Sequence, residues 1–164
     1  MYQRILVPVD GSPTSNRGLT EAIALGRLTG ARLRLINVVD VFSVAMEANA
    51  FAGYSGDLIP LMCEGGQKIL ATARAQAEAA GVSADTALRE GFAGRVSDLV
   101  IDEAKAWSAE LIVIGTHGRH GVGRLFLGSD AEQILRMAPV PVLLVRGARA
   151  SSGHAEPSLA AHAG

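Results

Sequence analysis

Cysteine is nearly absent from this sequence: Cys63 is the single cysteine among 164 residues. A lone cysteine cannot form an intrachain disulfide, and by itself it does not make a metal site. We therefore expect Cys63 to be a buried or unreactive thiol.

Long hydrophobic runs are also missing. The N-terminal apolar run ends at Asp10 after only about six residues, which is shorter than the apolar region of a signal peptide. No other stretch approaches the roughly twenty apolar residues that a membrane-spanning helix needs. These two absences predict a cytoplasmic protein that does not associate with membranes.

The chain has no excess of charge of either sign. Its 15 Lys and Arg residues nearly balance its 16 Asp and Glu residues, so the formal net charge is −1. A strongly basic face is the usual footprint of a protein that binds nucleic acid or an anionic membrane. We expect neither partner here.

Three sequence motifs of other nucleotide-binding or hydrolytic proteins are absent. No G-x-x-x-x-G-K-[ST] occurs, which excludes a P-loop ATPase. Residues 121–126 have Phe126 where a dinucleotide-binding fingerprint needs its third glycine. A triad of Ser129, His117 and Asp10 has no G-x-S-x-G elbow to support it. A dedicated enzyme is therefore the less favoured class.

Apolar runs alternate with segments of helical spacing along the chain. The runs predict buried strands at 4–9, 31–39, 83–89, 111–114 and 140–145. Helices are predicted between them, at 12–30, 57–80, 96–107 and 130–137, with Ser12 and Pro13 starting the first and Gly30 and Gly81 ending the first two. Such alternation favours a doubly wound, Rossmann-like α/β fold with a five-stranded parallel sheet.

This pattern occupies a single domain of residues 1–147. The remaining residues, 148–164, are rich in Ala, Ser, Gly and His and have little to bury, so a disordered tail is expected there. Residues 40–56 form a long connection without clear periodicity, which includes Phe42, Phe51 and Tyr54. We expect a mobile lid or partner surface, and the alternative is a buried extra helix.

The most informative stretch runs from Leu111 to Arg136. A buried strand leads into Gly115-Thr116-His117-Gly118, and after nine residues Gly128-Ser129 precedes a helix. Glycines let the backbone approach an anion, and free N–H groups at a helix start point at it. This arrangement of strand, loop and helix start is typical of a phosphate-binding site.

The spacing G-x-x-G-x9-G-[ST] resembles the nucleotide-binding signature of the universal stress protein family. Two further blocks resemble the family's first strand and turn, residues 5–12, and its last strand, residues 138–145. The resemblance covers roughly residues 2–147, nearly the whole domain. It implies that the chain is an ATP-binding member of the family and a homodimer through the last strand, Val140 to Val145.

The resemblance also implies a set of binding residues. Pro8, Val9 and Asp10 would line the base and sugar, and the backbone of Val38 or Val39 would meet adenine. The phosphate end would be formed by Ile114, Gly115, His117, Gly118, Arg119, Gly128, Ser129 and Asp130. The residues alone leave alternatives open: Asp10 is as well suited to cap the turn after the first strand, Ser129 to cap a helix, and the two valines to fill the core.

Asp130 is a departure from the pattern of many ATP-binding members, which have a small apolar residue there. A carboxylate in the first helical turn suits the helix dipole without any ligand. It could also repel a triphosphate, by roughly 4 kcal/mol at about 4 Å before screening. We therefore expect replacement of Asp130 by Val to tighten ATP binding, most visibly without Mg²⁺.

The expected function follows from these points. The resemblance implies binding of ATP, or of ADP or AMP, with Mg²⁺ held through the phosphates and not by protein side chains. The implied task is sensing or regulation under stress, with little or no hydrolysis. The alternative is a dimeric interaction module that binds no nucleotide or binds another adenine ligand.

Overall fold

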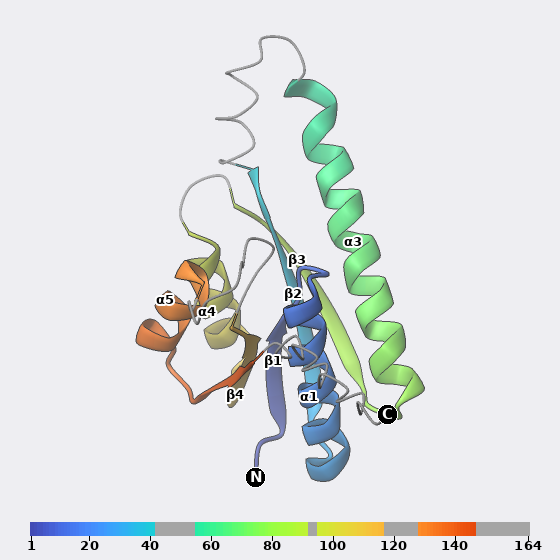
Figure 1. Cartoon of the computed structure of the whole chain (residues 1–164), viewed down its shortest axis with the longest axis vertical. Coiled ribbons are helices and arrows are strands. Elements are labelled where there is room, and N and C mark those ends of the chain that lie inside the picture. Colours follow the sequence, from blue (N-terminus) through green and yellow to red (C-terminus); the bar gives the residue numbers. More distant parts are fainter. Residues whose placement is uncertain (42–54, 92–94, 117–127, 147–164) are drawn as a thin grey trace, which may run out of the picture.

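The computed structural model describes residues 1–41, 55–91, 95–116 and 128–146. Its strands and helices alternate in the predicted order. They are β1 (Arg4–Pro8), α1 (Pro13–Thr29), β2 (Arg32–Asp40), α3 (Ser55–Ala79), β3 (Ala84–Gly91), α4 (Val96–Ala106), β4 (Leu111–Gly115), α5 (Ser129–Met137) and β5 (Val142–Val145). Figure 1 shows the long helix α3 running beside β2 and β3.

The five strands form one parallel sheet in the order β3-β2-β1-β4-β5. The chain therefore winds outward from β1 in one direction through β2 and β3, and in the other through β4 and β5. This arrangement confirms the predicted doubly wound fold. The strand order reverses between β1 and β4, and ligands of such sheets bind outside the carboxyl ends of the strands at that point.

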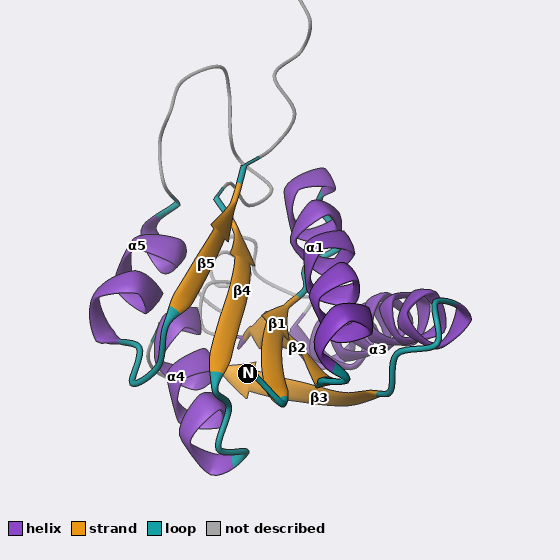
Figure 2. Ribbon diagram, turned by 90° about the horizontal axis from the view of Figure 1, so that it is seen from below, coloured by secondary structure: helices purple, strands orange, loops and turns teal. Residues whose placement is uncertain are grey.

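Helices cover both faces of the sheet (Figure 2). On one face, α1 and α3 bury apolar side chains such as Leu19 and Leu70 against Ile5, Val7 and Leu35. On the other face, α4 and α5 pack against a second core that includes Val100, Ile134, Leu6 and Ile112. Because both faces are buried, the central strands are apolar at consecutive positions, which is the pattern that the sequence shows.

The predicted ends of α1 are confirmed. The Ser12 hydroxyl accepts a hydrogen bond from the Ser15 N–H at 3.1 Å, and Pro13 is the first helical residue. At the other end Gly30 adopts a left-handed conformation with φ of 71°, and its N–H donates to the Gly26 carbonyl. A short polar cap and a terminal glycine are sufficient to define this helix locally.

Several predicted boundaries differ from the structure by one or two residues; for example, α3 begins at Ser55 and not at Asp57. Two of the differences lie close to the predicted site or the predicted dimer strand. Strand β5 begins at Val142 and not at Val140; Pro141 precedes it, and its carbonyl accepts a hydrogen bond from the Ile112 N–H at 3.0 Å. Ser129 is not a helix cap, because Gly128 has that position and Ser129 is the first residue of α5. The Gly128 carbonyl accepts the Glu132 N–H at 2.9 Å, which closes the first turn one residue earlier than predicted.

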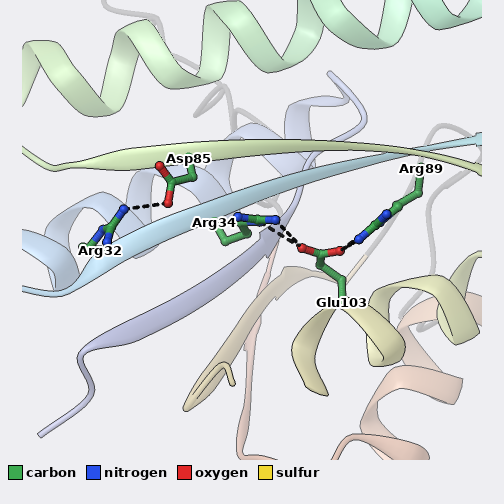
Figure 3. Close-up of polar contacts among 5 residues, drawn as sticks. All are labelled: Arg32, Arg34, Asp85, Arg89 and Glu103. Carbon is green, nitrogen blue, oxygen red and sulfur yellow. Dashed lines mark hydrogen bonds and ion pairs between the residues drawn. The ribbon is translucent and has the colours of Figure 1, made fainter. Parts of the chain in front are cut away.

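A buried carboxylate ties α4 to the sheet (Figure 3). Glu103 of α4 has a side chain that is only 1% exposed. Its Oε1 accepts from Arg34 of β2 at 2.8 and 2.9 Å, and its Oε2 accepts from Arg89 of β3. Trp107 lies 5.8 Å from the Arg34 guanidinium, measured to the ring centroid. The charge of Glu103 is therefore matched from two strands.

Parts of the predicted organisation lie outside the described residues. They are residues 42–54, with most of the segment expected to be a lid or partner surface, residues 92–94, residues 117–127 and residues 147–164, with the expected tail. Within the described ranges, no helix has both the length and the apolar composition to cross a membrane.

Candidate functional site

A tight turn follows β1. The Ser12 N–H donates to Oδ1 of Asp10 at 2.9 Å, and the Asp10 N–H donates to the Ser15 hydroxyl at 3.1 Å. Gly11 between them has φ of +76°, a conformation that suits glycine. The capping role of Asp10 is thus confirmed, and its half-buried carboxylate lies at the carboxyl end of the central strand. Its role toward a ribose remains a prediction.

The pairing register of β2 distinguishes Val38 from Val39, either of which could meet adenine according to the sequence. The Val9 N–H donates to the Ile36 carbonyl at 2.8 Å, while the Leu33 N–H donates to Ser83, just before β3. Since successive residues of a strand direct their N–H and C=O groups to opposite sides, Val38 directs its groups toward the β1 side. Val39 faces Glu90 of β3, and its side chain is 4% exposed.

Thr116 joins three elements at the end of β4. Its N–H donates to the Val145 carbonyl of β5 at 3.0 Å, and its carbonyl accepts from the Gly128 N–H at 3.0 Å. Thr116 and Gly128 are therefore adjacent in space, and the start of α5 lies at the end of β4. The sequence analysis did not single out Thr116, although it is the first variable position of the G-x-x-G motif.

Gly115 has a packing role that is independent of any ligand. A Cβ atom at this position would lie 2.5 Å from the Thr14 carbonyl oxygen in the first turn of α1. That distance is far below van der Waals contact, so α1 approaches the end of β4 only because residue 115 is glycine. The same close approach brings the turn after β1 next to the end of β4.

The first turn of α5 has the geometry of an anion-binding helix terminus. The first N–H groups of an α-helix have no partner within the helix, and the helix dipole adds partial positive charge there. Gly128, half-buried, and Ser129, exposed, stand at this end. The Gly128 N–H donates to the Thr116 carbonyl, so this helix start lies at the carboxyl end of β4.

Asp130 contacts α4 in a way that the sequence did not predict. Its carboxylate lies near the backbone N–H of Ser97, in the first turn of α4, and this N–H favours the charged form of the carboxylate. Burial raises the pKa of Asp130, and the neighbouring Asp40 and Asp98 raise it further, whereas the Ser97 N–H and Arg95 lower it. The carboxylate therefore joins the starts of α4 and α5 near the end of β2.

The structure gathers most predicted site residues at one edge of the sheet. Pro8 ends β1 and is followed by Val9 and Asp10, Val38 lies near the end of β2, and Gly115 ends β4, with Gly128, Ser129 and Asp130 at the start of α5. Ile114 and Val39 lie at the same edge, but their side chains are buried. His117, Gly118 and Arg119 lie outside the described residues.

No metal-binding cluster accompanies this edge in the part of the chain that the structure describes, where no three His, Cys, Asp or Glu side chains gather closely enough to hold an ion. A residue that the sequence analysis missed is Asn37, which is buried beside Val9 and donates to its carbonyl from Nδ2 at 2.7 Å. Its one sequence signal is an amide inside an otherwise apolar strand, residues 35–39.

The family model named "Universal stress protein family" matches residues 1–146 of this chain. The chain belongs to the universal stress protein family. It is 35% identical over 148 residues to a universal stress protein of Methanocaldococcus jannaschii, covering 89% of this chain and 83% of that protein. Among solved structures, a universal stress protein from Burkholderia pseudomallei is similar with a TM-score of 0.72 and 32% identity, covering 90% of this chain and 97% of that one.

Two more distant universal stress proteins share the fold and were solved with nucleotides. One was solved in complex with cAMP and is 24% identical, with a TM-score of 0.63, over 90% of this chain and 98% of that one. The other, from Archaeoglobus fulgidus, was solved in complex with dAMP and is 22% identical, with a TM-score of 0.64, over 88% of this chain and 98% of that one. At these identities, the likeness establishes the fold alone.

Proposed function

We propose that this universal stress protein binds an adenine nucleotide, with ATP as the principal ligand, at the carboxyl edge of β1, β2 and β4. The main support is the hydrogen bond from the Gly128 N–H to the Thr116 carbonyl, 3.0 Å long. Because of this bond the start of α5 lies at the carboxyl end of β4, one of the two strands at which the strand order reverses, and there the first N–H groups of the helix would bind a ligand phosphate.

The base and sugar would bind between the ends of β1 and β2. The backbone N–H and C=O of Val38 are directed toward β1, beyond its last paired residue, Pro8. Adenine presents an acceptor at N1 and a donor at N6, which complement one backbone N–H and one C=O. Asp10 would contact the ribose. The cAMP and dAMP bound by two distant family members support an adenine ligand.

The phosphates would extend from β1 toward α5. Gly115, Gly118, Gly128 and the Ser129 hydroxyl would contact them, with His117 and Arg119 supplying positive charge. Mg²⁺ would be bound through phosphate oxygens, where it neutralises part of their charge. In this proposal the protein senses or regulates under stress by its nucleotide-bound state, with little or no hydrolysis.

A glycine substitution tests the phosphate end. Gly128 has φ of −57° and ψ of 148°, values that valine also adopts, so Gly128→Val is compatible with the backbone. We expect calorimetry to show ATP affinity lowered by at least about tenfold, because the side chain shields the helix N–H groups, the equivalent of about one hydrogen bond. The free energy of unfolding should change by less than about 1 kcal/mol.

The matched control is Gly65→Val in α3, where an added Cβ meets no atom within 4 Å. It should leave ATP affinity unchanged. Undiminished ATP affinity in Gly128→Val would place the phosphates elsewhere. No binding of ATP, ADP or AMP by the unmodified chain, with or without Mg²⁺, would overturn the proposed function and favour an interaction module without nucleotide.

A further inference from the structure

Asn37 is a polar side chain in the core that the proposed binding residues do not include. It is 6% exposed and lies on the face of β2 that α3 covers. Its Nδ2 donates to the Val9 carbonyl at 2.7 Å. Val9 is the last residue before the turn at Asp10, so the amide holds the backbone where β1 leaves the sheet.

This hydrogen bond replaces a rung of the sheet. The Val9 N–H donates to the Ile36 carbonyl at 2.8 Å, and in a regular parallel ladder the Val38 N–H would next donate to the Val9 carbonyl. That rung is not formed among the described residues. The Val9 carbonyl accepts the Asn37 amide instead. Among the described residues, the donor at this carbonyl is thus the side-chain amide in place of the Val38 N–H.

A glycine in α3 makes room for the amide. A Cβ atom at Gly66 would lie 2.5 Å from Oδ1 of Asn37 and 2.7 Å from Cδ1 of Leu88. Glycine inside a helix is unfavourable relative to alanine. Helix α3 nevertheless has the pair Gly65-Gly66, and the second glycine is explained by its contact with Asn37. Gly66 therefore leaves space for the Asn37 side chain whose amide donates to the Val9 carbonyl.

We infer that Asn37 is a positioning residue that sets the preference for adenine by keeping the Val38 backbone free. This inference rests on the proposed function. By holding the Val9 carbonyl, Asn37 leaves the N–H and C=O of Val38 available to the N1 acceptor and N6 donor of adenine. Hypoxanthine, the base of inosine, has an N1–H donor and an O6 acceptor. The Val38 N–H would then face a donor and the Val38 C=O would face an acceptor, so neither hydrogen bond could form. Without the Asn37 amide, the Val38 N–H would close onto the Val9 carbonyl.

Hydrogen exchange in the unmodified, nucleotide-free protein tests the first step. We expect the Val38 amide to exchange much faster than the amides of Leu35 and Ile36 in the same strand, because its rung is open. It should become protected when ATP binds. Slow exchange of Val38 in the free protein would show that the rung is closed and would overturn the inference without any variant.

The second test compares ATP with inosine triphosphate by calorimetry. The unmodified chain should prefer ATP by about tenfold or more, the effect of one or two hydrogen bonds. In Asn37→Leu the two affinities should become nearly equal, through a loss on the ATP side. The control Val82→Ala shortens a buried side chain on the same face of the sheet. Val82 lies just before β3, at the amino end of that strand, whereas the site lies at the carboxyl ends. It should lower stability and keep the preference.

These outcomes separate the two proposals. If the unmodified chain binds ATP and Asn37→Leu retains the full preference for ATP over inosine triphosphate, the role of Asn37 is overturned and the proposed function stands. If the unmodified chain binds neither nucleotide, the proposed function fails. If Val82→Ala loses the preference for ATP over inosine triphosphate to the same extent, the loss in Asn37→Leu reflects lowered stability alone. That result would also overturn the inference.

Discussion

At the scale of single residues, the candidate site is built from groups that also serve the fold. Gly115 permits the approach of α1, since its Cβ would strike the Thr14 carbonyl, and Oδ1 of Asp10 accepts the Ser12 N–H. Both duties exist without a ligand. Variants at these two positions would therefore combine effects on folding and on binding, which is why Gly128 and Asn37 are better probes.

The titration of Asp130 gives a prediction at this scale. Burial raises its pKa above the ordinary value of 3.8. The folded state therefore binds more protons than the unfolded state in the window above pH 3.8, and stability falls as pH rises through that window. Asp130→Asn cannot ionise but retains an oxygen for the Ser97 N–H. The stability of the unmodified chain relative to this variant should therefore fall as pH rises.

Urea denaturation at a series of pH values from about 4 to 7 measures this difference. Two parallel curves would contradict the prediction. The same variant also tests whether Asp130 repels a triphosphate. The effect of Asp130→Asn on ATP affinity is measured separately from its effect on stability. Tighter ATP binding by Asp130→Asn at low salt without Mg²⁺ would place the carboxylate near the phosphates.

At the scale of elements, α4 is fastened to the sheet by the charge of Glu103. Two arginines on neighbouring strands contact one carboxylate, whose side chain is 1% exposed, while Arg34 and Arg89 are 25% and 47% exposed. Hydrogen bonds to a charged group contribute about 1.5–3 kcal/mol when they are made in the interior. The partial exposure of both arginines moderates the cost of losing their partner.

We expect Glu103→Gln to lower the free energy of unfolding by about 1–3 kcal/mol, measured by urea denaturation. The control is Asp85→Asn, which breaks the pair of Arg32 and Asp85 between the same two strands. That pair is 2.8 Å long but its side chains are 60% and 39% exposed, so its loss should change stability by about 0–1 kcal/mol. Equal effects of the two variants would show that burial of Glu103 does not strengthen its contacts.

At the scale of the whole molecule, β5 is the last strand on its side of the sheet, and no described strand pairs with its outer side. The carbonyls of Pro141 and Val145 accept hydrogen bonds from Ile112 and Thr116, so these residues face β4. By the alternation of a strand, Val142 and Leu144 direct their N–H and C=O groups outward. Apolar side chains are also exposed on β5 and α5: Leu143 of β5 is 39% exposed, and Leu135 and Met137 of α5 are 46% and 64% exposed. We propose that a second copy of the chain pairs with this edge.

The dimer prediction is tested with two proline variants. Val142→Pro removes an N–H that points outward, so it should leave the β4–β5 ladder intact and yield a folded monomer by light scattering. Leu143→Pro removes an N–H that faces β4, so it should lower the free energy of unfolding instead. If Val142→Pro remains folded and dimeric, the interface lies elsewhere on the molecule.

Much of the architecture was predictable because it depends on neighbours in the sequence. Apolar runs indicated the strands, and Ser12, Pro13 and Gly30 defined α1 through local hydrogen bonds. Alternation of strands and helices then favours the parallel, doubly wound sheet, since its crossovers have one preferred hand. The spacing of Gly115, Gly118 and Gly128 likewise indicated a loop between a strand and a helix start.

The remaining features depend on contacts between residues far apart in the chain. Asn37 and Val9 are separated by 28 positions, and Arg34 and Glu103 by 69. Periodicity shows that a residue is buried, but it does not show which partner meets it there. The sequence by itself therefore determined the elements, their order and the signature loop. Tertiary structure decided that Val38 and not Val39 directs its backbone toward β1, because the pairing register of β2 sets that direction.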